Sequence, residues 1–275
     1  MKLLLLALAS ALPTLATATV VNIDLATDTS GGYTGFGAAE TVSGHTTWNV
    51  AAYAGSSGSV ALNDMVDSTG APTLIDFSLT GLDGLDGEGA QNPSGEMERS
   101  GGYSGLMRDY VRVDGVSGGV VATASGTISG LVVGGSYDLY FYGQGELFSS
   151  GASLLRGQNT LFTVNGVSKQ TSWDGAGVSP NSGDGFLVEG IEYVKFTAVA
   201  IGGVINFSFS NVVATGSTPN VATDLAPNQN TAPGDNTGSR YGALNGIQIV
   251  SVVPEPSSAL LGMLGLAGLL ARRRR

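Results

Sequence analysis

Carboxylate side chains are the groups best suited to chemistry in this chain, because cysteine is absent and histidine occurs once, as His45. Without cysteine there is no thiolate nucleophile, thiolate zinc site or iron–sulfur cluster. Asp83, Asp86 and Glu88 lie in a glycine-rich stretch, DGLDGEG, and offer the oxygen ligands that calcium prefers. Their spacing does not match an EF-hand loop, so a solvated acidic loop is the favoured interpretation and a calcium site the alternative.

Catalytic groups are difficult to single out by spacing. Glu189 and Glu192 form the type of pair that a glycosidase uses, with carboxyl groups about 5–10 Å apart. With 21 acidic residues between positions 19 and 250, some such pair is expected by chance. Serine and aspartate partners for His45 can be named in any chain of this length, so His45 is expected to be structural or on the surface. The sequence favours a protein that is not an enzyme and needs no cofactor.

Aromatic residues are the second group with a chemical use, since the apolar face of a sugar can stack on an aromatic ring. The candidate glycan contacts are Trp173, Trp48 and Tyr241, with Tyr103 as a further aromatic. Trp173 comes first among them because Asp174–Gly175, a turn signal, follows it directly. Packing in the core is the alternative for every isolated aromatic.

The charge balance limits the partners. The chain has a formal charge of −10, and residues 19–250 carry 7 basic and 21 acidic residues, a charge of −14. A nucleic-acid partner is excluded on electrostatic grounds, and anionic substrates are repelled. Neutral glycans and divalent cations remain compatible with this charge.

Residues 19–250 must position these groups, and their pattern is that of β-structure. Apolar and polar residues alternate in short runs separated by glycine-rich turns, and no 3.6-residue period is evident. Asn165–Gly166 predicts a type I′ hairpin, and Gly134–Gly135 is expected to join residues 131–133 to the strand after it. Two long loops are expected at 81–105 and 214–239. The prediction is one all-β domain, an antiparallel, jelly-roll-like β-sandwich. The clearest strand candidates are residues 20–25, 73–79, 110–113, 137–142, 160–164, 191–198, 204–210 and 247–250.

Residues 1–18 have the layout of a secretory signal peptide. Lys2 precedes an apolar run from Leu3 to Leu12, and Pro13 ends it. Ala16 and Ala18 then supply the small residues of an A-x-A cleavage site. We expect signal peptidase to cut after Ala18, so that residues 19 onward leave the cytoplasm.

Residues 251–275 contain three parts in a fixed order. Val253, Pro254, Glu255 and Pro256 form a rigid extended segment, because each proline fixes φ and disfavours helix before it. Residues 257–271 are apolar and uncharged, and Arg272, Arg273, Arg274 and Arg275 follow. Because the run is apolar and uncharged, we expect a short transmembrane helix in the inner membrane. Fifteen helical residues rise about 22 Å, which is less than the hydrocarbon core of about 30 Å, and local thinning of the bilayer can meet the difference. The arginines are expected to stay in the cytoplasm as a stop signal.

This C-terminal arrangement resembles the PEP-CTERM sorting signal of Gram-negative bacteria. The resemblance covers about the last 24 residues and implies recognition by an exosortase, with Pro254, Glu255 and Pro256 as the motif. It also implies cleavage near that motif and transfer to the cell surface or extracellular matrix. The strand pattern of residues 20–250 is similar to jelly-roll, galactose-binding-like modules, which implies contact with glycans without locating a site.

The sequence therefore predicts an exported, non-enzymatic protein of the cell surface or matrix that is held transiently in the inner membrane. Exosortase and signal peptidase are its expected processing partners, and exopolysaccharide is a candidate ligand. Two alternatives stay open: a glycan-active enzyme that uses paired carboxylates, and a purely structural matrix protein.

Overall fold

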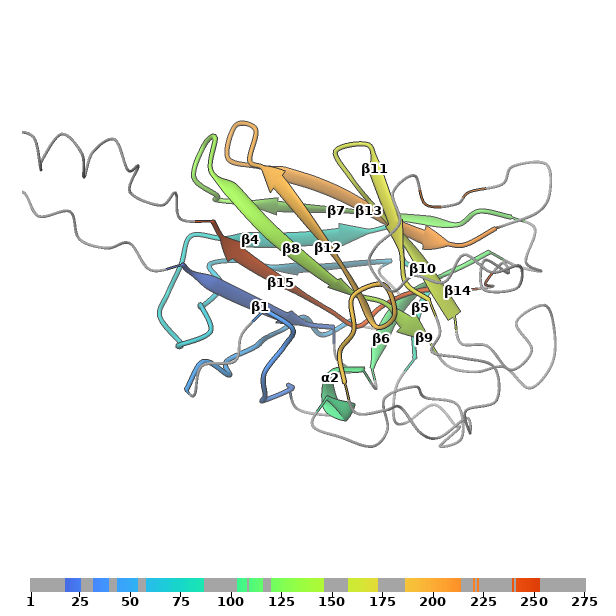
Figure 1. Ribbon diagram of the computed structural model, residues 1–275, viewed down its shortest axis with the longest axis horizontal. Helices are drawn as coiled ribbons and strands as arrows, with labels where there is room; N and C mark the ends of the chain where they lie inside the picture. The colour runs from blue at the N-terminus through green and yellow to red at the C-terminus, as the bar shows by residue number, and fades with distance from the viewer. Residues whose placement is uncertain are drawn as a thin grey trace, which may run out of the picture. The chain divides into compact units, whose positions relative to one another are not determined.

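Two large β-sheets packed face to face and a small third sheet make up the computed structural model (Figure 1). Residues Thr19–Ser251 form one compact unit, separate from the two ends of the chain. The all-β antiparallel sandwich that the alternating pattern predicted is confirmed. The structure describes residues 18–25, 32–39, 44–53, 58–86, 103–107, 109–115, 120–145, 158–172, 186–213, 220, 222, 239 and 241–252.

The five-stranded sheet has the order β12-β8-β15-β1-β2 and faces the viewer in Figure 1. All its pairs are antiparallel except β1–β2. The last strand of the body, β15, is its central strand and pairs with the first, β1. The strands are β1 (Val20–Asp24), β2 (Asn49–Val50), β8 (Ser136–Tyr142), β12 (Tyr193–Val199) and β15 (Gly246–Ser251).

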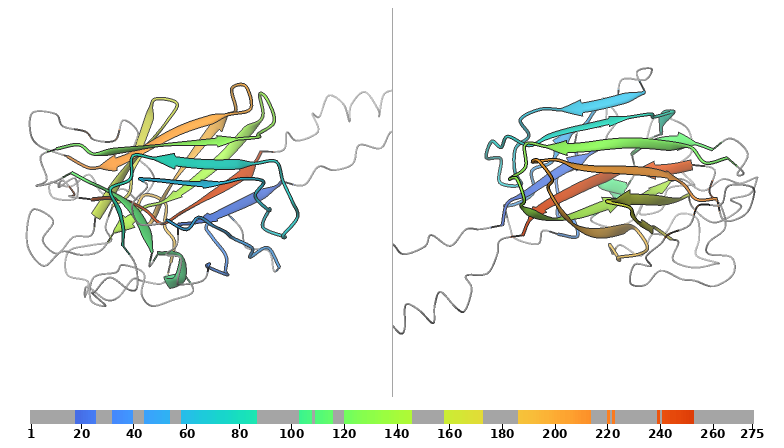
Figure 2. Two further views of the ribbon diagram at one scale, coloured as in Figure 1. Left: turned by 180° about the vertical axis from the view of Figure 1, so that it is seen from behind. Right: turned by 90° about the horizontal axis from the view of Figure 1, so that it is seen from above.

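The seven-stranded sheet has the order β11-β10-β13-β7-β4-β3, with β9 paired to β10, and is antiparallel throughout. The left view of Figure 2 shows it from its own side. Its strands are β3 (Ser59–Leu62), β4 (Asp76–Thr80), β7 (Thr123–Ser129), β9 (Gln144–Gly145), β10 (Gln158–Val164), β11 (Val167–Gln170) and β13 (Ile205–Asn211).

A small third sheet, β14-β6-β5, closes one end of the sandwich together with the one-turn helix α2 (Ser104–Met107). Its strands are β5 (Gly84–Asp86), β6 (Tyr110–Asp114) and β14 (Tyr241–Leu244). Asn245, the single residue between β14 and β15, is fully buried. Its Nδ2 donates to the carbonyls of Met107 (3.0 Å) and Asp109 (3.2 Å), and its Oδ1 accepts from the Gln144 N–H (2.8 Å). These bonds fix the point at which the chain passes from one sheet to another.

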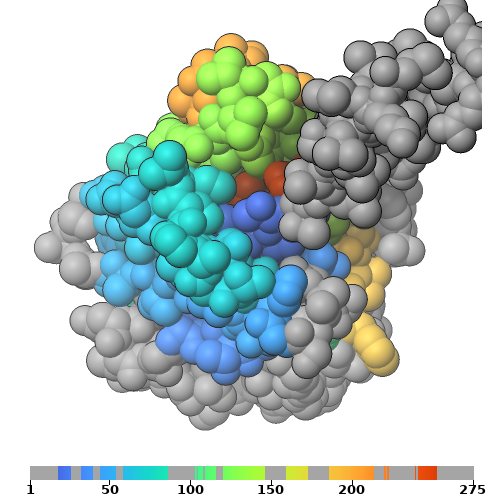
Figure 3. Space-filling model, turned by 90° about the vertical axis from the view of Figure 1, so that its left-hand side faces the viewer, coloured from blue at the N-terminus to red at the C-terminus, as the bar shows by residue number. Residues whose placement is uncertain are grey.

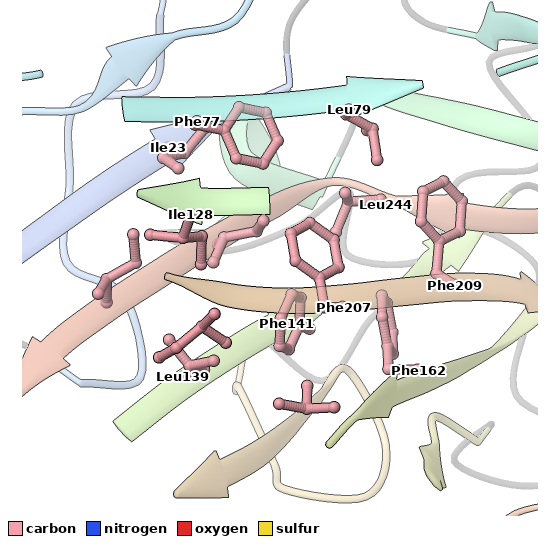
Figure 4. Packing of buried hydrophobic residues seen from close by; sticks show 14 of the residues in the cluster. Ile23, Phe77, Leu79, Ile128, Leu139, Phe141, Phe162, Phe207, Phe209 and Leu244 are labelled. Atoms are coloured by element: carbon pink, nitrogen blue, oxygen red, sulfur yellow. The ribbon is translucent and has the colours of Figure 1, made fainter. Parts of the chain in front are cut away.

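The core lies between the two large sheets and is dominated by aromatic rings (Figure 4). The Phe141 ring centroid lies 4.9 Å from that of Phe207 and 5.1 Å from that of Phe162, so residues of both sheets meet there. Gly126 lies beneath the Phe207 ring, and a Cβ at this position would come within 2.1 Å of the ring. Glycine in the middle of β7 is therefore required by packing and not by a turn.

Of the two turns predicted from glycine-containing dipeptides, the structure confirms one as a hairpin. Asn165 and Gly166 have φ of 51° and 79° and connect β10 to its neighbour β11, so the hairpin is confirmed. Gly134–Gly135 does not close a hairpin, because residues 131–133 form no strand and the chain crosses here from β7 in one sheet to β8 in the other. The expected loop 81–105 contains β5 and α2 in its described parts.

None of the helices in the described ranges is long and apolar enough to cross a membrane. The apolar segment 257–271, which the sequence predicts to do so, lies outside these ranges.

Candidate functional site

The outer face of the five-stranded sheet carries the polar and aromatic side chains that point away from the core. Strand register places them in rows across the sheet. One row runs through Asn22, Gln248, Tyr140 and Lys195, and the next runs through Asp24, Gly246, Tyr142 and Tyr193. Because alternate residues of a strand face the same side, these rows follow directly from the sequence alternation once the register is set.

Half of this face is covered by the residues that follow β1. The Ala38 N–H donates to Tyr142 Oη (2.6 Å), and the Ala39 N–H donates to Gln248 Oε1 (2.9 Å). Gln248 Nε2 donates in turn to Asn22 Oδ1 (2.8 Å). These polar side chains over β1 and β15 are buried and hydrogen-bonded, so they hold the covering segment in place and are closed to a ligand.

Over β8 and β12 the same face is half-exposed. Here Tyr140, Tyr193, Lys195 and Asp138 form a cluster that we call the tyrosine patch. The two tyrosine ring centroids lie 5.7 Å apart with their planes at 39°. Lys195 Nζ lies 2.7 Å from Asp138 Oδ2 and 5.3 Å from the Tyr140 ring centroid. On its other oxygen Asp138 accepts a hydrogen bond from Thr197 Oγ1 (2.6 Å).

Two groups of the patch, Lys195 and Tyr193, are held in their protonated forms. The hydrogen bond from Lys195 to Asp138 raises the pKa of the lysine, which therefore stays charged at neutral pH. Partial burial, with the nearby Glu189 carboxylate, raises the pKa of Tyr193 to about 12, so its hydroxyl remains a donor. The patch therefore offers two partly accessible rings beside fixed hydrogen-bonding groups. That combination is suited to stacking and hydrogen bonding.

The aromatic candidates from the sequence lie elsewhere. Trp48 is 7 % exposed; its Nε1–H donates to the Gly35 carbonyl (2.9 Å) and its ring centroid lies 5.2 Å from that of Tyr33. Tyr241 is 6 % exposed and lies under the Arg112 guanidinium, 4.2 Å from the ring centroid. Neither ring presents a free face to a sugar. Trp173 lies outside the described residues.

The acidic residues that the sequence offers as calcium ligands or catalytic groups do not come together in the described part of the structure. Asp83 is exposed, and its Oδ2 accepts from the Asp114 N–H (2.8 Å). The Asp86 side chain and all of Glu88 lie outside the described residues. Among the side chains that are described, no group of three or more potential metal ligands occurs. Glu192 is buried, with Oε2 accepting from the Val188 N–H (2.7 Å), while Glu189 and His45 are half-buried.

A buried carboxyl group at the end of β1 has an unusual titration. Asp24 is 1 % exposed, and its Oδ2 accepts from the Tyr33 N–H (2.7 Å). Its Oδ1 has no hydrogen-bond partner among the described residues. Burial raises the pKa of Asp24 to about 7, and the Asp109 carboxylate adds to the rise, while the hydrogen bond from Tyr33 opposes it. At acidic pH this group is therefore a neutral acid inside the fold.

The first and last residues of the compact unit, Thr19 and Ser251, lie next to each other. The Thr19 N–H donates to Ser251 Oγ (2.7 Å), and the Ser251 N–H donates to the Thr19 carbonyl (2.9 Å). Ala18 is exposed directly before this pair and Val252 directly after it. The expected signal-peptidase cut and the start of the C-terminal segment are thus held at one point of the body. Ala16, Val253, Pro254, Glu255, Pro256 and Arg272–Arg275 lie outside the described residues.

The sequence alone does not single out the patch residues, because they lie in strands whose alternation marks chiefly the core-facing side chains. In SYDLYFY the alternation puts Tyr137, Leu139 and Phe141 inside, which leaves Tyr140 on the outer face. The same alternation in YVKFTAV leaves Tyr193 and Lys195 outside. The signal was therefore present, but only the pairing of β8 with β12 brings the two tyrosines together.

Comparison with known proteins identifies one part of the chain. The PEP-CTERM protein-sorting motif matches residues 252–275, which contain the proline-flanked glutamate, the apolar segment and the arginines. No curated protein and no solved structure matches the chain. The resemblance of the body to galactose-binding-like modules is therefore not supported by any related protein. The motif implies a transmembrane segment at the C-terminal end and transit anchored in the membrane. The chain thus carries a PEP-CTERM sorting motif and is an exported protein sorted by exosortase.

Proposed function

We propose that the body, Thr19–Ser251, is a non-enzymatic component of the cell surface or extracellular matrix that binds a neutral polysaccharide through the tyrosine patch. The observation that supports this proposal is the pair of half-exposed rings, Tyr140 and Tyr193, beside the Lys195–Asp138 ion pair. Sugar rings present apolar C–H faces and hydroxyl edges, and the patch has a counterpart for each.

The position of the patch supports a long ligand. β12 is the edge strand of its sheet, so a chain lying across Tyr193 and Tyr140 meets no further described strand on that side. The charge of the body argues for a neutral polymer, since a net charge of −14 repels anionic glycans over the screening length of about 8 Å at physiological salt.

The patch contains no arrangement that favours hydrolysis. Asp138 is the carboxylate within it, and both of its oxygens are engaged, by Lys195 and by Thr197. Glu192, one of the pair considered for a glycosidase, is buried under its own turn. A binding role is therefore the better use of these residues.

Affinity electrophoresis of purified Thr19–Ser251 in gels containing neutral polysaccharides tests the proposal. The wild type should be retarded saturably, and Tyr140→Ala should weaken binding on the order of tenfold, equivalent to about 1.4 kcal/mol of lost stacking. Tyr140→Phe is the matched control, because it keeps the ring and should keep most of the affinity. Val167→Ala, on an exposed hairpin of the other sheet, should have no effect.

Three results would overturn the proposal. Absence of saturable retardation of the wild type with every neutral polymer would leave a purely structural role, and equal saturable retardation of the wild type and Tyr140→Ala would exclude the tyrosine patch as the binding site. Release of reducing sugar ends by the wild-type protein would identify a glycan-active enzyme.

A further inference from the structure

The most exposed apolar side chains of the described residues gather at one end of the sandwich. Leu74, Val132, Val133 and Ile201 are each between 71 % and 77 % exposed, and we call them the apolar rim. Large apolar side chains exposed to this degree are unusual when they occur together, and such patches mark sites of interaction.

Backbone hydrogen bonds hold the rim as one surface. The turn between β7 and β8 carries Val132 and Val133, and the turn between β12 and β13 carries Ile201. The Leu131 N–H donates to the Gly203 carbonyl (3.1 Å) and the Gly134 N–H to the Ala200 carbonyl (2.8 Å), so the two turns are joined. Leu74 lies beside Gly130, whose Cβ would overlap the Leu74 carbonyl. Figure 3 looks at this end, with the two turns in green and orange and the segment around Leu74 in teal.

The rim lies at the end of the body where the sorting motif begins. Ser251, the last residue of β15, pairs with Tyr137 at the start of β8, directly after the Val132–Val133 turn. The motif begins at residue 252, and the apolar segment within it begins at 257. The five intervening residues span at most about 18 Å when fully extended. A body tethered this closely must keep this end near the bilayer surface.

Charge does not explain the exposure of the rim. Acidic residues lie close to Leu74 in the chain: Asp76 follows it by two positions, and the Asp76 Oδ1 accepts a hydrogen bond from the Asp64 N–H (2.8 Å). Acidic groups disfavour an anionic surface, so attraction between this end and a membrane has to come from the apolar side chains.

We propose that the apolar rim contacts the lipid bilayer while the chain is anchored by its sorting segment, so that the body rests against the membrane through Val132, Val133, Ile201 and Leu74. This contact orients the junction at Ser251–Val252 at the bilayer surface before exosortase acts.

Single-cysteine labelling tests the contact, because the chain has no cysteine of its own. Full-length Val133→Cys is labelled with an environment-sensitive fluorophore and reconstituted at a low protein-to-lipid ratio into phosphatidylcholine vesicles containing spin-labelled lipid. Val120→Cys is the matched control: it replaces an exposed valine at the opposite end of the sandwich, where the Val120 carbonyl accepts from Asn211 Nδ2.

The label at 133 should shift to shorter wavelength and be quenched by the spin-labelled lipid, and the label at 120 should show neither effect. Added salt should not weaken quenching at 133, because apolar burial and not charge makes the contact. Equal and weak quenching at both positions would overturn the proposal. Protection at 133 that needs added exosortase and occurs without lipid quenching would overturn it too, and would assign the rim to the enzyme.

Discussion

Replacing Asp24 with asparagine should remove most of the pH dependence of stability between pH 4 and 7. In the folded protein the pKa of Asp24 is about 7, whereas the ordinary value is 3.8. Between these values the folded state binds one proton more than the unfolded state, so the free energy of unfolding falls as pH rises. The fall ends near pH 7, above which the carboxyl group is ionised in both states.

The size of the effect follows from the difference in pKa. About three pKa units at 1.36 kcal/mol each give a loss of about 4 kcal/mol from pH 4 to pH 8. Asparagine has no charged form, and its side-chain oxygen can still accept the hydrogen bond from the Tyr33 N–H. The variant should therefore match the wild type near pH 4 and be more stable by about 4 kcal/mol at pH 8.

Urea unfolding of Thr19–Ser251 at half-unit pH steps, followed by tryptophan fluorescence, measures this difference. Asp109→Asn serves as a second variant, because removing that neighbouring carboxylate should move the pH midpoint downward without abolishing it. Parallel pH profiles for the wild type and Asp24→Asn would refute the reasoning, as would an Asp24→Asn variant less stable than the wild type at pH 8.

Three further predictions concern the core, the corner between sheets and the sorting segment. Phe141→Ala should lower the free energy of unfolding by about 3–5 kcal/mol in urea titrations, because it empties the centre of the aromatic cluster. Asn245→Ala should lower the free energy of unfolding by about 3 kcal/mol, because it leaves two buried carbonyls and one N–H without partners. Its control is Asn206→Ala, at an exposed position of β13, which should change the free energy of unfolding by less than about 0.5 kcal/mol in the same assay. Replacing Pro254–Glu255–Pro256 with alanines should make the intact chain accumulate in the membrane fraction on immunoblots, and normal release would contradict sorting through the motif.

Alternating strands were predictable because each buries one face only. In β13 the sequence INFSFSN places Ile205, Phe207 and Phe209 on the core side, as its periodicity predicts. β7 was missed because TASGTIS is rich in small and polar residues. Its role depends on Gly126, which makes room for the Phe207 ring of a neighbouring strand. The need for glycine at position 126 comes from Phe207, 81 positions further along the chain, so the residues around Gly126 do not reveal it.

Of the functional features, the sorting motif could be predicted from the sequence and the tyrosine patch could not. The sorting motif was readable because its information is local: order, charge and spacing lie within 24 residues. The tyrosine patch was not, because Tyr140 and Tyr193 become neighbours only through the pairing of β8 with β12. Trp48 was misleading for a related reason: its burial depends on contacts with Tyr33 and Tyr142, which only the folded chain brings to it.

The central place of β15 determines when folding can finish. A chain exported from its N-terminal end delivers this strand last, and until it arrives β8 and β1 have no common neighbour to join them. Contacts between residues this distant in sequence form slowly, because a long loop must close before they can be made. The five-stranded sheet is therefore completed only after nearly all of the body has been exported, at the point in the chain where the sorting motif follows.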